Sequence, residues 1–333
     1  MEIMVGLVIG ALGIIIMLQL FAFSEGQKRA ITGGDDIQNN GAIALYGLQR
    51  DILQGGYGIS DVKLLGCDVT LPSGVILGAM APVTINPPAI PPGDANTDTV
   101  LVVYGNSNGS PQGDGISSQP ATASYAVQTP TSFVANDQVV AAPQNRPVSC
   151  ALVLDQVAAV ANPNVTVATG VANMTNGTLY NLGQAPKILA YAVRGGNLTQ
   201  CDFTLVDCRS AENTVSAATW LTMWPAIASN IVSLRAEYGR DTSVPKDAMV
   251  DVYDQSTPAT ACGWSAVYAL RIALVARSVQ FEKNALTTSA PAWMGTAPIV
   301  LTGNADWQHY RYKVFQTVAP IRNVTWLGVQ TGC

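Results

Sequence analysis

The feature that most constrains this chain is an uninterrupted apolar segment at its N-terminus. Residues 3–23 contain no charged side chain, and Gln19 is the only clearly polar one. As a helix at about 1.5 Å per residue, the segment is roughly 30 Å long, which matches the hydrocarbon thickness of a membrane. The sequence therefore predicts a transmembrane or assembly helix over residues 1–23. Its apolar surface includes Ile3, Val5, Leu7, Ile9, Leu12, Ile15, Leu18 and Phe21.

Glu2 places a carboxylate at the very edge of this apolar segment. An unpaired charge that is drawn into lipid costs at least about 2.5 kcal/mol. The carboxylate therefore needs either water at the membrane surface or a cationic partner. The segment alone leaves both interpretations open, since charged residues commonly flank transmembrane helices.

The second half of the stem, residues 24–56, begins with a polar stretch that contains Gly33 and Gly34. Each glycine weakens a helix by about 1 kcal/mol relative to alanine, so we expect the stem to bend or melt there. Apolar or small residues then recur every three or four positions, which predicts an amphipathic helix that ends at Gly55 and Gly56. Its stripe consists of Ile37, Gly41, Leu45, Leu48 and Ile52, of which the four large residues are expected to pack on the head.

Residues 57–333 are predicted to form a β-rich head with a polar but largely uncharged surface. Charged residues make up 12% of the chain, about half of the usual 25%. Short strand patterns separated by turn residues favour a mainly antiparallel sheet on the helical stem, an α+β, pilin-like fold. The expected strands are residues 97–104, 124–128, 138–141, 150–157, 187–194, 198–206, 231–238, 267–278 and 310–320.

Two regions are predicted to be loops because they lack apolar periodicity. They are residues 57–92, whose Pro-rich part 85–93 is expected to be polyproline-like and exposed, and residues 105–119. Residues 267–278 are ambiguous, since they contain good helix formers. Arg271 and Arg277 share one strand parity, opposite the apolar residues, so a strand is favoured.

Six cysteines favour disulfide bonds and an oxidising compartment, because the chain carries a membrane anchor. They are Cys67, Cys150, Cys201, Cys208, Cys262 and Cys333. The cysteines allow 15 pairings, among which the sequence cannot choose; the short spacing suggests Cys201 with Cys208. No CxxC pair occurs, so a zinc site is not expected.

The charge distribution bears on orientation and on nucleic acid. Lys28 and Arg29 follow the apolar segment, which by the positive-inside rule would put the head in the cytoplasm. The cysteines argue for the opposite side, and we follow the cysteines. With a net charge of −5 and no larger basic cluster, no nucleic-acid partner is expected.

One pattern resembles a hydrolase motif. Gly105, Ser107 and Gly109 fit G-x-S-x-G after a predicted strand, and His309 lies downstream as a candidate base. That motif requires a helix directly after the serine, whereas the Pro- and Gly-containing residues 110–115 cannot form one. A surface turn is therefore favoured, and a membrane-anchored serine hydrolase that uses Ser107 is an alternative function.

A metal site and a cofactor are not expected. Asp94, Asn96 and Asp98 alternate as calcium ligands do, but no glycine or closing glutamate follows at EF-hand spacing. The chain has no GxGxxG, P-loop or HExxH motif. The sequence therefore predicts that the protein is not an enzyme.

Several segments together resemble the PilW family of minor type IV pilins. Residues 1–17 are similar to the assembly helix of type IV pilins, whose conserved glutamate falls on Glu2. Residues 40–58 resemble the family's Arg-Asp, apolar, Gly-Tyr pattern through Arg50, Asp51, Gly56 and Tyr57. Further segments of the chain resemble segments of the family and follow in the same order: TDTVLVVYG, LYNLG, the hairpin ending in Leu198, SLRAEYGRD, WSAVYALRIALVARS and YRYKVFQTVAPIRN.

The resemblance implies a minor pilin that helps to prime the assembly of a type IV pilus and contributes to its tip complex. Its expected partners are other minor and major pilins through the N-terminal helix, the inner-membrane assembly machinery, a tip adhesin and the membrane. The head is expected in the periplasm before assembly and in the extracellular filament afterwards, with roles in adhesion and twitching motility. A J-type pseudopilin of type II secretion is the alternative within this class.

Met1 falls roughly three residues inside the usual mature end of a pilin. We therefore expect the processed and N-methylated terminus to lie upstream, after a short basic leader. In a bundle of such helices, Glu2 would gain a neighbour's N-terminal ammonium as partner. The favoured role of Glu2 is then that of an assembly residue.

Overall fold

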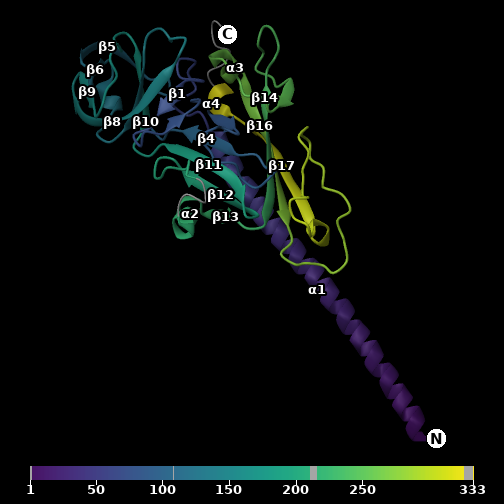
Figure 1. Ribbon diagram of the computed structural model, residues 1–333. Coiled ribbons are helices and arrows are strands. Elements are labelled where there is room, and N and C mark those ends of the chain that lie inside the picture. Colours follow the sequence, from purple (N-terminus) through teal and green to yellow (C-terminus); the bar gives the residue numbers. More distant parts are fainter. Residues whose placement is uncertain (1, 108, 211–215, 326–332) are drawn as a thin grey trace.

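The computed structural model describes residues 2–107, 109–210, 216–325 and 333. A single long helix, α1 (Glu2–Gln54), projects from a β-rich head (Figure 1). The first half of this stem stands clear of the head, whereas its second half is enclosed by strands from distant parts of the chain. The predicted α+β, pilin-like architecture is confirmed.

The stem runs through Gly33 and Gly34 without interruption, so the expected break at these residues is not present. Two glycines lower the stability of a helix but do not end it where packing on either side supplies more energy. Here the head begins to cover the helix: Gly33 is buried, and a Cβ on it would lie 3.6 Å from the Cβ atom of Ser278. The stem ends as predicted, because Gly56 follows with φ of +88°.

The first sheet of the head has five antiparallel strands in the order β13-β12-β11-β4-β3. The hairpin of β11 and β12, joined through Gly195 and Gly196, confirms the sequence prediction. The strand bounds are β3 (Val83–Ile85), β4 (Val100–Tyr104), β11 (Lys187–Arg194), β12 (Asn197–Asp202) and β13 (Ala226–Ala228).

The second sheet has four antiparallel strands in the order β15-β14-β16-β17. Residues 267–277 form a strand, as the parity of the arginines predicted: Leu270, Ile272 and Leu274 are fully buried and alternate with Arg271. The bounds are β14 (Ile231–Arg240), β15 (Val252–Asp254), β16 (Val267–Arg277) and β17 (Tyr312–Pro320). Short helices lie beside the sheets: α2 (Ala217–Met223), α3 (Ala261–Ser265), η3 (Trp307–His309) and α4 (Arg322–Thr325).

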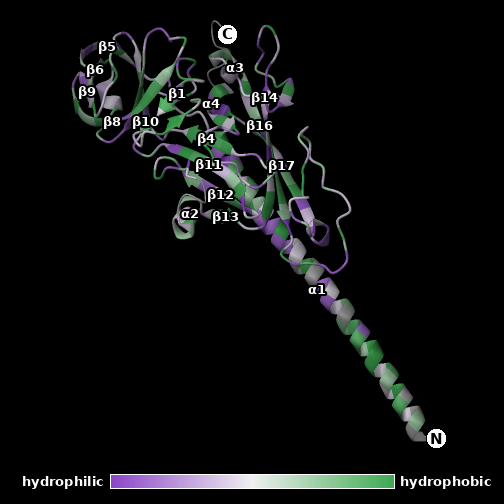
Figure 2. Cartoon of the chain, in the orientation of Figure 1, coloured by the Kyte–Doolittle hydropathy of each residue, from purple (hydrophilic) through white to green (hydrophobic). Residues whose placement is uncertain are grey.

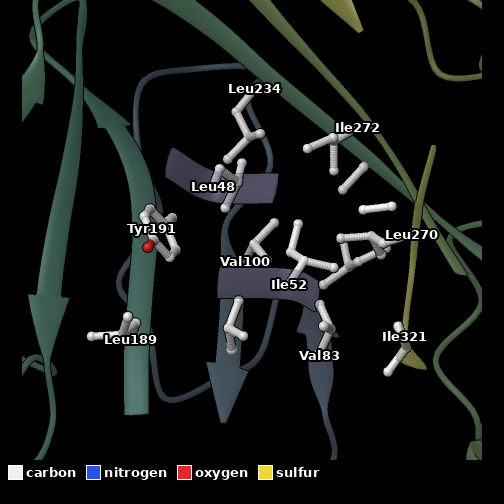
Figure 3. Packing of buried hydrophobic residues seen from close by; sticks show 14 of the residues in the cluster. Leu48, Ile52, Val83, Val100, Leu189, Tyr191, Leu234, Leu270, Ile272 and Ile321 are labelled. Carbon is white, nitrogen blue, oxygen red and sulfur yellow. The ribbon is translucent and has the colours of Figure 1, made fainter. Parts of the chain in front are cut away.

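The stem enters the core between these two sheets. Leu48 and Ile52 of α1 lie between Val100, Leu189 and Tyr191 of one sheet and Leu234, Leu270 and Ile272 of the other (Figure 3). The end of the helix is therefore a structural element of the head and not a tether attached to its surface.

A third unit, at the upper left of Figure 1, is a six-stranded antiparallel barrel. Its strands follow the order β8-β7-β10-β5-β6-β9, and β9 pairs with β8 to close the ring. The strands are β5 (Asp114–Ala121), β6 (Ser124–Val127), β7 (Gln138–Ala142), β8 (Ala151–Ala161), β9 (Asn164–Val167) and β10 (Thr178–Gly183). The turn η1 (Pro130–Ser132) precedes β7, and β1 (Asp68–Thr70) and β2 (Ile76–Leu77) extend the sheet from β8.

The barrel is an insertion into the five-stranded sheet. The chain leaves that sheet at Tyr104 and returns at Lys187, and these two residues are register partners in the pairing of β4 with β11. The barrel has its own apolar core, which includes Ile116, Tyr125 and Leu179. Adjacent entry and exit points and a separate core are the properties of an inserted domain.

Three sequence expectations about loops are wrong. Residues 105–119 contain most of β5, and residues 57–92 contain β1, β2 and β3. The Pro-rich segment is not exposed throughout: Ala89 and Ile90 are buried in the core that joins the barrel to the five-stranded sheet, whereas Pro88 and Pro92 are exposed. The strands β9, β10, β13 and β15 were not predicted. Apart from β10 these strands are short, so their local patterns are weak. Strand β9 forms a hairpin with the preceding β8, whereas β10 pairs with the distant β5 and β7, which a local pattern does not reveal.

Candidate functional site

The first half of the stem is mainly hydrophobic (Figure 2), and its large apolar side chains are exposed. Six of the predicted membrane-helix residues each expose at least 50% of their surface: Leu7, Ile9, Leu12, Ile15, Leu18 and Phe21. The side chains of Glu2, Ile3 and Val5 lie outside the described part of the structure, although the backbone of all three is in α1. A continuous apolar surface of this kind requires lipid or other apolar helices around it.

Within the described residues, one helix is long and apolar enough to cross a membrane. It is the part of α1 from Ile9 to Gln54, and no part of its apolar window is buried.

The second half of the stem is held by its apolar stripe. Ile37, Leu48 and Ile52 are buried, and Leu45 is partly buried against the same core. Gly41 is covered by the ring of Phe315 in β17, and a Cβ on this glycine would lie 2.1 Å from a ring carbon. The glycine in the stripe therefore lets the helix approach β17 closely.

A buried carboxylate lies where the stem meets the five-stranded sheet. Asp51 is 4% exposed and accepts hydrogen bonds from the hydroxyl groups of Tyr104, at 3.2 Å, and Tyr191. Gln200 donates to the hydroxyl oxygen of Tyr191 at 2.6 Å, and the exposed Arg50 lies 3.6 Å from the Asp51 carboxylate. Burial, and then the charge of Asp51, raise the pKa of both tyrosines above the ordinary value of 10.0.

The C-terminal end of the stem is capped from the far end of the chain. The amide Nδ2 of Asn323 donates to the carbonyl oxygens of Gln54 and Gly55, both at 3.0 Å. The last four carbonyls of an α-helix have no partner within it. The carbonyl of Gln54, the last helical residue, also accepts from the backbone N–H of Tyr57 at 3.3 Å. Asn323 therefore ties α4 to the stem.

Replacing Asn323 by alanine is expected to lower the free energy of unfolding by about 1 kcal/mol, because two carbonyls lose a protein donor while remaining partly accessible to water. Urea denaturation of the full chain in detergent would measure the change. Arg322→Ala is the control: this side chain is exposed and we expect a change within about 0.5 kcal/mol. Equal effects of the two substitutions would argue against a cap.

Three disulfides join the cysteines in pairs. Cys201 and Cys208 are bonded, as their spacing suggested, and the other pairs are Cys67 with Cys150 and Cys262 with Cys333. The Cys67–Cys150 bond links the segment after the stem to the start of β8 in the barrel. No free cysteine occurs in the described part of the chain, in keeping with an oxidising compartment.

The structure does not bring Ser107 and His309 together. Ser107 is buried, and its hydroxyl oxygen accepts a hydrogen bond from the backbone N–H of Gly109 at 2.8 Å. His309 stacks on Phe281, and its Nδ1 atom lies 2.7 Å from the carbonyl oxygen of Glu282. A serine nucleophile needs its base within hydrogen-bond reach, so this pair is not a catalytic one.

The alternating acids of residues 94–98 also serve separate purposes. Asp94 accepts hydrogen bonds from the backbone N–H groups of Gly195 and Gly196, whereas Asp98 pairs with Arg235 at 3.5 Å. Among the described residues, no group of three or more His, Cys, Asp or Glu side chains could hold a metal ion.

The comparison with protein families bears on the part of the head that holds the stem. Residues 199–323 match the PilW family, type IV pilus-assembly protein W. The match runs from β12 to Asn323, so it includes the whole four-stranded sheet. It also includes Phe315, whose ring covers Gly41 of the stem, and Asn323, which caps the end of the stem. Searches of curated proteins and of solved structures gave no match.

The PilW match confirms the resemblance that the sequence segments suggested. It sets the chain in the context of type IV pilus assembly, and proteins of this family are generally structural and not enzymes. Together with the apolar stem, it indicates a membrane or pilus location. The stem itself and the barrel lie outside the matched residues.

Sequence reasoning missed the buried role of Asp51 and the cap by Asn323. The position of Asp51 carried a signal, since it lies three residues after Leu48 and one before Ile52, on the buried face of the helix. Nothing local marks Asn323, because the carbonyls that it caps lie 268 and 269 residues away.

Proposed function

We propose that this chain is a minor pilin that helps to prime the assembly of a type IV pilus and to form its tip complex. The observation that carries the proposal is one continuous helix with two different halves. Its first half exposes apolar side chains on all sides, and its second half is enclosed by the sheet that matches the PilW family. Such a subunit can transmit the position of its stem directly to its head.

The physical basis is the transfer of an apolar helix from lipid into a bundle of related helices. Both surroundings are apolar, so the transfer requires no exposure of these side chains to water. Residues 1–23 would form the membrane and assembly helix, residues 24–56 the junction, and residues 57–333 the extracytoplasmic head. The partners would be other pilins through the stem and the inner-membrane machinery, with a tip adhesin beside the head.

The test is to identify the protein in pili sheared from its native host, with the mass of its N-terminal peptide. A minor pilin is expected in the pilus fraction in small amounts, with a processed and methylated N-terminus. Its absence from pili, together with a secretion defect on deletion of its gene, would support a J-type pseudopilin instead. A protein that stays in the inner membrane with neither defect would contradict both assignments.

A further inference from the structure

The surface of the inserted barrel is nearly free of charge. Residues 105–186 contain four charged side chains: Asp114, Asp137, Arg146 and Asp155. The three aspartates are at most 8% exposed, and the Nη1 atom of Arg146 donates to the carbonyl oxygens of Val62 and Lys63 at 2.7 and 3.4 Å. What remains on the barrel surface is hydroxyl, amide and small apolar groups. Such a surface has no electrostatic attraction for nucleic acid or anionic lipid, and it loses little hydration energy on contact with a neutral partner.

One cavity of about 480 Å³ lies where the barrel joins the five-stranded sheet. This volume is in the range of small-ligand sites, about 300–1,000 Å³. Its walls come from the strand exit after β4, the turn η1 and the end of β10, and its side chains are mainly hydroxyls and amides. The pocket thus lies at the two points where the chain passes between sheet and barrel.

Two buried polar side chains that are hydrogen-bonded to each other line this pocket. Asp137 and Asn181 are each 5% exposed, and Asn181 Nδ2 donates to Asp137 Oδ2 and to the carbonyl oxygen of Ser132, both at 2.7 Å. Asp137 Oδ2 also accepts from the backbone N–H of Val134 at 2.9 Å. The second carboxylate oxygen, Oδ1, accepts no hydrogen bond from the described residues. One acceptor of a buried carboxylate that lines the pocket is therefore available to a ligand.

Two exposed residues with donor groups, Asn106 and Thr131, form part of the rim of the pocket. The Asn106 Oδ1 atom accepts from the backbone N–H of Ala185 at 3.1 Å, which leaves its Nδ2 group without a hydrogen bond to any described residue. The exposed Thr131 hydroxyl likewise makes none within the described chain. Gly183, with φ of +83°, makes this arrangement possible: a Cβ there would lie 2.3 Å from Asn106 Oδ1.

We propose that this pocket binds a neutral, hydroxyl-rich ligand, namely an uncharged saccharide unit of a surface polymer. A sugar hydroxyl can donate to Asp137 Oδ1 while its neighbours accept from Asn106 and Thr131. An anionic ligand would be repelled by the carboxylate, and a divalent cation would find only one carboxylate where such sites usually have several. The proposal goes beyond a role in pilus assembly and does not depend on it.

The experiment uses the full chain in a detergent without a sugar headgroup, labelled and applied to an array of neutral, acidic and amine-bearing oligosaccharides. Binding to one or more neutral saccharides is expected. The dissociation constant of the best ligand should change by less than about twofold between low and high NaCl, since no charged partner is screened.

Two variants and one matched control test the pocket. Thr131→Trp fills the rim and should weaken binding at least about tenfold, and Asp137→Asn, which keeps the shape but loses the charge-assisted hydrogen bond, should weaken it by about tenfold. Thr122→Trp, the same change at an exposed position in the β5–β6 turn outside the pocket, should bind as the wild type does. Near-ultraviolet circular dichroism would verify the fold of each variant.

Several results would overturn the proposal. They are the absence of any bound neutral saccharide, a preference for acidic or amine-bearing ligands that falls as salt rises, and neutral binding that both pocket variants retain. If Thr131→Trp fails to fold, Asp137→Asn decides alone.

Discussion

Replacing Glu2 by alanine is expected to leave the protein in the membrane but to keep it out of pili. The apolar part of α1 that inserts the chain does not include Glu2, and its side chains are exposed along the helix. Within a bundle of such helices, the carboxylate would pair with a neighbour's N-terminal ammonium in an apolar environment. Breaking a buried ion pair by removing one partner costs about 3–5 kcal/mol, since the other charge stays unpaired.

The measurement is the amount of an epitope-tagged variant in sheared pili relative to the inner membrane. We expect a loss of at least about a hundredfold, because each 1.4 kcal/mol corresponds to a factor of ten. Asp35→Ala is the matched control: Asp35 lies on the same helix but is exposed in its polar half. If the Glu2 variant entered pili normally, or if the Asp35 variant were excluded equally, the proposed role of Glu2 would be wrong.

Those elements that a local pattern encodes were predictable from the sequence. The apolar segment and the stripe ending at Gly55 defined the stem, and the Gly195-Gly196 turn defined the hairpin of β11 and β12. The alternation of Arg271 with buried neighbours decided between helix and strand for β16. In each case the signal and the structure extend over the same short range.

The closed barrel could not be predicted, although three of its strands, β6, β7 and β8, were expected from their local patterns. Strand β5 contains Ile116 as its only large apolar residue, and its other positions are small or polar. It becomes a strand by pairing with β6 and β10, and β10 lies more than fifty residues later. The candidate saccharide pocket has the same property, since Asn106, Thr131 and Asn181 are far apart in the sequence and line one pocket only in the folded chain.

Replacing Asp51 by alanine is expected to lower the free energy of unfolding by about 2–4 kcal/mol. The substitution leaves the hydroxyl groups of Tyr104 and Tyr191 without their acceptor in a buried site, and each unsatisfied group costs about 1–3 kcal/mol. Urea denaturation in detergent measures the change. The effect should be large beside that of Arg50→Ala, which removes only an exposed side chain at 3.6 Å and should cost less than about 1 kcal/mol.

The same cluster gives the stability a dependence on alkaline pH. Burial first, and the charge of Asp51 second, raise the pKa of Tyr104 and Tyr191 above 10.0 in the folded state. The tyrosines therefore contribute their full stabilisation below pH 10. As the pH rises above 10, the unfolded chain loses protons that the folded one retains, so the free energy of unfolding falls.

This fall should be smaller in Asp51→Ala, because one of the two causes of the raised pKa is gone. If the free energy of unfolding fell equally at alkaline pH in wild type and variant, burial alone would set the pKa values of these tyrosines. Asp51 would then not couple the stem to the head electrostatically.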